Sequence, residues 1–263
     1  MGWVVAQGLY PKRPFTNVTG EPSMFKFFKE MLDSVKEGIA EGKAELAEEE
    51  AARQASLQEG NAALKARLAA SSRYENFTVA LAAVYRQTFG PDLKEAREAQ
   101  RSAVHLLCVD IAPDEVEAWK KLLARDFSVT NANEAESVVT EIVDSLPSQP
   151  SNDDLALWIG RAAHLSTAAA AVGYISASAA LDWLEPAVVL AVEHFDSWPN
   201  YAQSFLAGER NAPGSNVLGR KLLGSVSEKL LEDELSPWKV VAWPPRDALE
   251  ELLASRGAAP RPA

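Results

Sequence analysis

Histidine and carboxylate side chains near residue 194 are the first groups in this chain that could bind a metal ion. Glu193, His194 and Asp196 lie almost side by side, and His164 could supply a second imidazole from the preceding helix. All are capable metal ligands. Consecutive residues of a helix point in different directions, however, so these three cannot converge on one ion without help from elsewhere. The pattern favours ordinary core or surface histidines, and no metal or other cofactor is expected.

The single cysteine, Cys108, follows His105 by three residues, a spacing that could form a thiol–imidazole pair. Its neighbours Leu107 and Val109 are apolar, and a cysteine in such surroundings is more often buried and inert. One cysteine can form neither a disulfide framework nor a cysteine-rich zinc site. A reducing cytoplasm is therefore the expected location.

The segment 214–221, Gly-Ser-Asn-Val-Leu-Gly-Arg-Lys, nearly matches a phosphate-binding loop. Such a loop needs a lysine directly after its second glycine and then a serine or threonine, but Arg220 and Lys221 occupy those places. No apolar strand precedes the segment. We therefore expect 214–221 to begin a helix.

Other catalytic signatures do not occur in the sequence, including the serine-hydrolase elbow, the zinc-protease helix and the dinucleotide-binding glycine pattern. A carboxylate pair drawn from Asp153, Asp154, Asp182 and Glu185 remains an alternative, although such residues usually cap helices or face solvent. The sequence thus predicts a protein that is not an enzyme, with an enzyme of unrecognised type as the alternative.

Five of the seven tryptophans lie between residues 158 and 243. Flat aromatic faces can stack on sugars, bases or cations, which makes a small-ligand site one hypothesis. Trp158 and Trp183 fall on apolar helical faces, whereas Trp198, Trp238 and Trp243 stand at helix starts or in loops. There a ring can cover the edge of a core while its N–H reaches a backbone carbonyl. Packing is the favoured role.

Arg161 lies one helical turn after Trp158, on the same apolar helix. On such a helix an arginine is expected to pair with a buried carboxylate, for which Asp182 and Glu185 are the candidates. The alternative is that Arg161 binds a ligand.

Hydrophobic periodicity, caps and breakers predict a mainly α fold, a multi-helix globular array with at most one or two short strands. The expected helices cover residues 24–46, 74–89, 93–103, 114–125, 133–146, 152–172, 176–195, 198–208, 217–232 and 246–255. An exposed helical extension fills 45–61, a short extended run fills 104–111, and Pro186 either kinks its helix or begins a new one. We expect an N-terminal helical segment (1–109), an all-α domain (110–256) and a disordered tail (257–263).

Four stretches follow one another in a characteristic order: Leu-Trp-Ile-Gly-Arg (157–161), Ala-Val-Gly-Tyr-Ile-Ser (171–176), Ser-Trp-Pro-Asn-Tyr (197–201) and Ser-Pro-Trp (236–238). This order resembles the bacterial domain-of-unknown-function family 1266 over about residues 110–245. The matching positions are Trp158, Arg161, Gly173, Tyr174, Trp198, Tyr201, Gly208, Pro237, Trp238 and Trp243. After Gly208 the chain departs from the family, because Glu-Arg-Asn-Ala-Pro-Gly replaces a loop that contains an aromatic residue. The resemblance implies a domain and no activity.

The formal net charge is −11, with a pI near 4.9, which argues against nucleic acid or an anionic membrane surface as the partner. Acidic residues greatly outnumber basic ones between Asp110 and Asp154. Such a run is usually a solvated face, but it could also steer a basic protein toward its binding site. The expected contact residues are Asp114, Glu115, Glu117, Glu134, Glu136 and Glu141. We therefore predict a cytoplasmic module that binds another protein, of the kind that neutralises a secreted basic toxin or supports a secretion system.

Overall fold

The computed structural model describes residues 23–89, 106, 107, 109, 111 and 113–257. Within this part of the chain every regular element is a helix and there is no strand. The multi-helix fold class is therefore confirmed. No helix of the described residues has both the length and the apolar character needed to cross a membrane.

The chain divides into two compact units, residues 1–54 and 55–263. One helix, α1 (Ser23–Ala70), contributes to both. It passes through Gly60 without a break, so the expected helix and its helical extension form one element. Alanine, glutamate and lysine favour a helix by intrinsic propensity, even where few side chains can be buried. In the first unit, Leu46 is accordingly 63% exposed.

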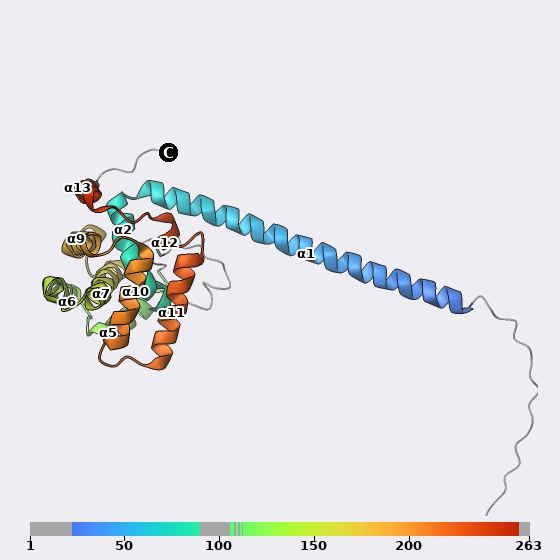
Figure 1. Cartoon of the computed structure of the whole chain (residues 1–263), viewed down its shortest axis with the longest axis horizontal. Helices are drawn as coiled ribbons and strands as arrows, with labels where there is room; N and C mark the ends of the chain where they lie inside the picture. The colour runs from blue at the N-terminus through green and yellow to red at the C-terminus, as the bar shows by residue number, and fades with distance from the viewer. Residues whose placement is uncertain (1–22, 90–105, 108, 110, 112, 258–263) are drawn as a thin grey trace, which may run out of the picture. The chain divides into compact units, whose positions relative to one another are not determined.

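The second unit is built around α7 (Asn152–Ala171). Its neighbours include α2 (Arg73–Leu81), α3 (Ala83–Phe89), α5 (Val116–Phe127), α6 (Ala132–Ser145), α9 (Glu185–His194) and α10 (Trp198–Asn211) (Figure 1). Alanines on several faces of α7 are fully buried, which lets these neighbours approach closely. The core thus surrounds α7 rather than lying along one stripe of it.

The contact between α7 and α10 depends on Gly208. A Cβ atom at Gly208 would lie 2.3 Å from the carbonyl oxygen of Asp153 and 2.9 Å from the Cβ of Leu157. No real Cβ comes that close to a backbone oxygen, so any larger residue would push the two helices apart. The glycine therefore fixes how α10 lies against the start of α7.

Local signals set most helix boundaries. The hydroxyls of Ser151, Ser176 and Ser197 each accept a hydrogen bond from a backbone N–H in the first turn of the helix that follows. Pro186 lies in the first turn of α9, directly after α8 (Ala177–Trp183), so it begins a helix instead of kinking one. Asn131 caps α6 in the same way as the serines, so this helix begins at Ala132, one residue before the expected start at 133.

A short 3-10 helix, η2 (Leu146–Ser148), joins α6 to α7. The elements after α10 are α11 (Val217–Glu232), α12 (Pro237–Val240), η3 (Arg246–Ala248) and α13 (Leu249–Ala254). Gly173 has φ +79°, a left-handed conformation that ends α7 and that L side chains rarely adopt.

The second unit includes α2 and α3, which lie before residue 110. The expected domain boundary at residue 110 would have placed these two helices in the N-terminal segment. The hydroxyl of Tyr74 donates to the carbonyl of Leu181 at 2.8 Å, and the indole N–H of Trp238 donates to the carbonyl of Ala80 at 3.0 Å. Tyr74 and Ala80 are fully buried. Helices distant in sequence are therefore joined in one core.

Several expectations fall on residues outside the described ranges: the helix over 93–103, the pairing of His105 with Cys108, and the tail beyond Gly257. The described residues of the expected extended run, 104–111, are not in a strand. Leu106 and Leu107 are buried there, and the carbonyl of Leu107 accepts hydrogen bonds from Arg67 at 2.8 and 3.1 Å. An apolar run of this length is buried as readily in an irregular connection as in a strand.

Candidate functional site

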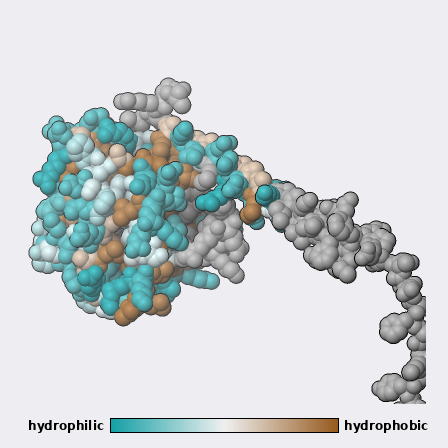
Figure 2. All heavy atoms as spheres, turned by 45° about the vertical axis from the view of Figure 1, so that its right-hand side comes forward, coloured by the Kyte–Doolittle hydropathy of each residue, from teal (hydrophilic) through white to brown (hydrophobic). Residues whose placement is uncertain are grey.

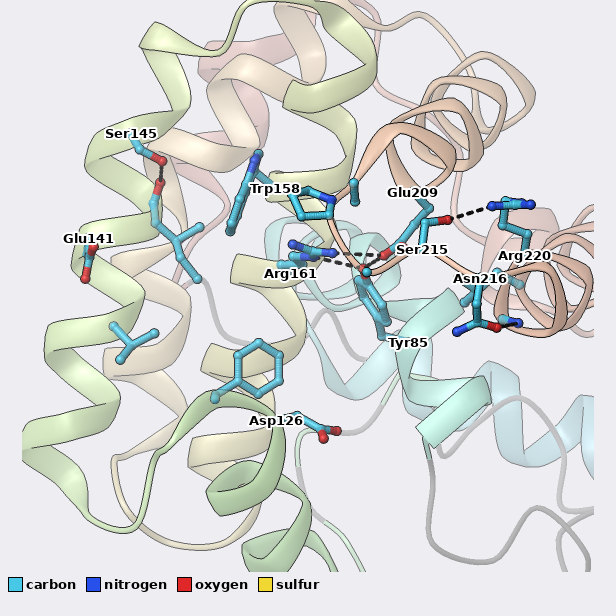
Figure 3. Close-up of a pocket in the computed structure, with 18 residues that line it drawn as sticks. Tyr85, Asp126, Glu141, Ser145, Trp158, Arg161, Glu209, Ser215, Asn216 and Arg220 are labelled. Atoms are coloured by element: carbon cyan, nitrogen blue, oxygen red, sulfur yellow. Dashed lines mark hydrogen bonds and ion pairs between the residues drawn. The ribbon is translucent and has the colours of Figure 1, made fainter.

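A pocket of about 720 Å³ opens between α5, α6, α7, α10 and the connection that leads into α11. Figure 3 shows the side chains that line it, including Trp158 and Arg161 from α7, Tyr85 from α3 and Glu209 from α10. This volume lies within the range of about 300–1,000 Å³ that is typical of ligand sites. We take this pocket as the candidate site.

Arg161 lies at the centre of the pocket. Its guanidinium carbon is 4.9 Å from the centroid of the Trp158 ring, within the range of a cation–π contact. Its Nη2 lies 3.4 Å from Oε1 of Glu209, and its Nε donates to the hydroxyl oxygen of Tyr85 at 3.2 Å. The side chain of Arg161 is 25% exposed and that of Glu209 is 14% exposed. Arg161 is therefore half-buried against a carboxylate.

The expected partners of Arg161 were Asp182 and Glu185, and this assignment is wrong. Both carboxylates pair instead with Arg256, near the C-terminus of the described chain. Glu209 takes their place because the close approach at Gly208 holds the next residue of α10 beside α7. The partner of Arg161 is thus a carboxylate, as expected, but it comes from α10 and not from the segment that contains Asp182 and Glu185.

Tyr85 completes the central group. Burial raises the pKa of its phenol far above the ordinary value, so the hydroxyl stays protonated and can donate. It donates to the carboxylate of Glu209, whose Oε1 also faces Arg161. One carboxylate thus accepts from a neutral donor and a cationic donor, and the charges of Arg161 and Glu209 offset each other.

His164 and His194, the two histidines that could have bound a metal ion, have different surroundings. His164 is buried among aromatic rings, 5.5 Å from the ring centroid of Tyr85 and 6.0 Å from that of Phe127. Burial lowers the pKa of His164 to about 3, so its imidazole is neutral. His194 is exposed, with Nδ1 3.0 Å from Oδ1 of Asn152. In the described part of the chain no three potential metal ligands come together.

The segment that nearly matches a phosphate-binding loop begins a helix, as expected. Asn216 caps α11, and its Oδ1 accepts a hydrogen bond from the N–H of Gly219 at 2.8 Å. The segment also lines the pocket, since Arg220 faces it and donates to the hydroxyl of Ser215 at 3.2 Å. No carboxylate of the described residues lies within ion-pair distance of Arg220.

Only one of the six expected partner-binding acids, Glu141, lines the pocket. Glu134 has a local role, since its carboxylate accepts hydrogen bonds from the N–H and hydroxyl of Thr130 at the start of α6. Glu117 pairs with Lys120 at 2.9 Å. Asp114 and Glu136 are exposed and Glu115 is half-buried. The structure therefore does not bring all six acids together in one site.

Most family tryptophans lie away from the pocket, in an aromatic cluster with Tyr201. The rings of Trp198 and Trp243 meet edge to face at 4.7 Å, and those of Trp198 and Trp238 stack at 5.5 Å. The indole N–H groups of Trp198 and Trp243 donate to the carbonyls of Val241 and Phe195. These rings pack the core, whereas Trp158 faces the pocket.

The other family positions have local structural roles. Pro237 is buried and begins α12, and Tyr174 is half-buried beside Gly173. Gly173 ends α7 with its positive φ, and Gly208 allows the close contact between α7 and α10.

The pocket also contains residues that the sequence analysis did not single out for a site, chiefly Tyr85, Asp126 and Glu209. Tyr85 looked like part of an apolar stripe, and Glu209 opened a loop in which the chain departs from its family. Two signals in the sequence did point to the pocket: the near match at 214–221, on its α11 side, and the pair Trp158 and Arg161, considered above for ligand binding.

Comparisons with known proteins agree with the family motifs. No curated protein and no solved structure matches this chain. One family model matches residues 26–243, a longer stretch than the expected 110–245, and it includes α2 and α3. Since the match covers most of the sequence, the chain belongs to the family described as Protein of unknown function (DUF1266).

Proposed function

We propose that this protein is an interaction module that binds another protein, and that the partner contacts the pocket and its rim. The proposal rests on exposed apolar side chains beside the pocket. Val217 and Leu218, at the start of α11, are 61% and 78% exposed, and Leu222 on the same helix is also exposed. They neighbour Gly219, Arg220 and Leu223, which line the pocket. Apolar groups around a polar depression are typical of a protein contact surface.

Charge supports a basic partner. The chain carries a net charge of −11, and Figure 2 shows hydrophilic side chains over much of the visible face of the second unit. Asp126 and Glu141 carry negative charge to the pocket itself. Acidic groups of this kind raise the rate of encounter with a basic protein, while affinity comes from apolar contacts at the centre.

The finer proposal is a cytoplasmic immunity protein that binds and neutralises a basic toxin or effector. It rests on the acidic charge and on analogy with how small acidic proteins of this kind are used. The pocket favours a second candidate, a regulatory protein that binds a small ligand, because its volume suits one.

The first experiment tests the apolar rim. The full chain is used to capture its partner from the native host, and the affinity of the purified pair is then measured. Leu218→Asp should weaken the complex at least tenfold, since it places a charge in the apolar contact. Leu46→Asp is the matched control, because Leu46 is a comparably exposed leucine of a helix in the first unit. Equal affinity of the two variants, or the lack of any stoichiometric partner, would defeat the proposal.

A second experiment tests the charge. Reversing Asp114, Glu117 and Glu136 to lysine should slow association more than it speeds dissociation, and should reduce the dependence on salt. Glu134 is left unchanged, because its contacts with Thr130 stabilise the start of α6. Unchanged association kinetics would show that the partner is not steered by these charges.

A further inference from the structure

The pocket has charges of opposite sign on two of its sides. Arg220 lies on the α11 side, whereas Glu141 lies on the α6 side and Asp126 at the end of α5 (Figure 3). Trp158 and Arg161 lie between these sides in the same view. A ligand that spans the pocket would therefore meet a cation at one end and carboxylates at the other.

The groups in the middle add little net charge. Arg161 is offset by Glu209, which also accepts from the protonated Tyr85. Arg220 has only the neutral hydroxyl of Ser215 as a hydrogen-bond partner among the described residues. Both carboxylate oxygens of Asp126 accept hydrogen bonds from the neighbouring Arg125, at 2.5 and 2.7 Å, although the side chain of Arg125 is 68% exposed and water screens this ion pair. Among the described residues, Arg220 and Glu141 have no ion-pair partner, so their charges remain available to a ligand, whereas Asp126 shares its charge with Arg125 at the surface.

The pocket is also too large for a single charged group. A volume of about 720 Å³ suits a ligand of drug size, with an apolar body between its polar ends. Phe127, Val138 and Ile142 supply apolar surface for such a body. The complementary ligand has a carboxylate, an apolar segment and a cation.

We infer that the pocket binds the C-terminus of a polypeptide whose last residue is arginine or lysine. The terminal carboxylate pairs with Arg220, the basic side chain reaches Asp126 and Glu141, and the stem of that side chain lies along the apolar wall. A C-terminal basic residue carries both charges at once, whereas an internal segment would need an additional acidic residue. This inference rests on the proposed function, since it names the part of the partner that enters the pocket.

The test uses Nα-benzoyl-arginine as a probe of the full chain, with binding followed by titration calorimetry and by NMR. Two analogues each remove one charge: Nα-benzoyl-argininamide lacks the carboxylate and Nα-benzoyl-citrulline lacks the cation. Both should bind at least fivefold more weakly than the probe. Equal binding of all three compounds, or no binding of the probe, would overturn the inference. Free arginine should bind more weakly still, and equal affinity for it would assign the pocket to a small metabolite instead.

Variants locate the two charges. Arg220→Gln should weaken the probe at least fivefold and remove its advantage over the amide, while Asp126→Asn with Glu141→Gln should remove its advantage over the citrulline analogue. Lys221→Gln is the matched control, because Lys221 is the next residue of α11, is exposed and does not line the pocket. An equal effect of Lys221→Gln would point to general charge rather than to the pocket. If the protein partner binds normally while the probe fails, this inference alone is lost and the interaction module stands.

Discussion

Arg161 and Glu209 form an ion pair across the contact between α7 and α10, with 3.4 Å between Nη2 and Oε1. The same guanidinium lies against the ring of Trp158 and donates to Tyr85. Helix packing and the centre of the pocket therefore depend on one another. The close approach at Gly208 sets the distance between the two helices, and the ion pair occupies the space beside it.

Replacing Arg161 should test this pair through stability. Arg161→Ala leaves the carboxylate of Glu209 half-buried without its cation, and we expect the free energy of unfolding to fall by about 3 kcal/mol, the lower end of the cost for a buried pair. Urea denaturation measures this change. The double variant Arg161→Ala, Glu209→Gln should lose less than the sum of the two single variants, because it removes both charges. Strict additivity would show that the two residues do not interact.

Gly208→Ala should destabilise the protein by about 2 kcal/mol, within the usual cost of overpacking, because its Cβ would meet the backbone oxygen of Asp153. Gly224→Ala is the control. It lies inside α11, where a Cβ atom would meet no side chain and no other helix within 4 Å, so alanine there should add about 0.5–1 kcal/mol of stability. Thermal or urea unfolding compares the two. Similar effects of both substitutions would mean that the α7–α10 contact tolerates a side chain.

His164 should make stability depend on pH. Burial, aided by the nearby charge of Arg86, lowers the pKa of His164 to about 3, compared with about 6.5 when unfolded. Below pH 6.5 the unfolded chain gains a proton that the folded chain does not accept. Stability from this residue is thus complete above pH 6.5 and falls as the pH drops toward 3, by up to about 1.4 kcal/mol per pH unit.

Urea denaturation between pH 7 and pH 5 measures this slope, with His164→Leu as the comparison. The variant has no imidazole to protonate, so its stability should change less over this interval, whatever its absolute value. Identical slopes would mean that His164 is protonated in the folded protein, contrary to its burial.

The sequence was sufficient to predict structural features that depend on neighbouring residues alone. The helices expected to begin at residues 152, 176 and 198 begin within one residue of those positions, because a serine before each one accepts a hydrogen bond from a backbone N–H in its first turn. Pro186 left two possibilities open, since the same ring that would break a helix interior is well placed in a first turn. The structure selects the second.

The centre of the pocket could not be predicted in this way. Which carboxylate faces Arg161 depends on the helix that packs beside it, and no pattern within α7 encodes that choice. Tyr85 belongs to an apolar stripe by its spacing, and only the fold places its hydroxyl against Glu209. Arg220 was noticed for its position in a near match to a phosphate loop, although its surroundings follow from the connection between α10 and α11.

Truncation should show where the second unit begins. A fragment of residues 55–257 retains α2 and α3, and we expect it to unfold cooperatively at nearly the melting temperature of the full chain. A fragment of residues 110–257 lacks Tyr74 and Phe77, both buried in the core, and it removes the carbonyl of Ala80 that accepts from Trp238. It also lacks the buried Val79, Leu81, Val84 and Tyr85. At about 1.5–3 kcal/mol for each large buried side chain, the total loss is comparable with the whole net stability of a domain, about 5–15 kcal/mol. Circular dichroism should therefore record no cooperative thermal transition for the shorter fragment, whereas a sharp transition would support a domain boundary near residue 110.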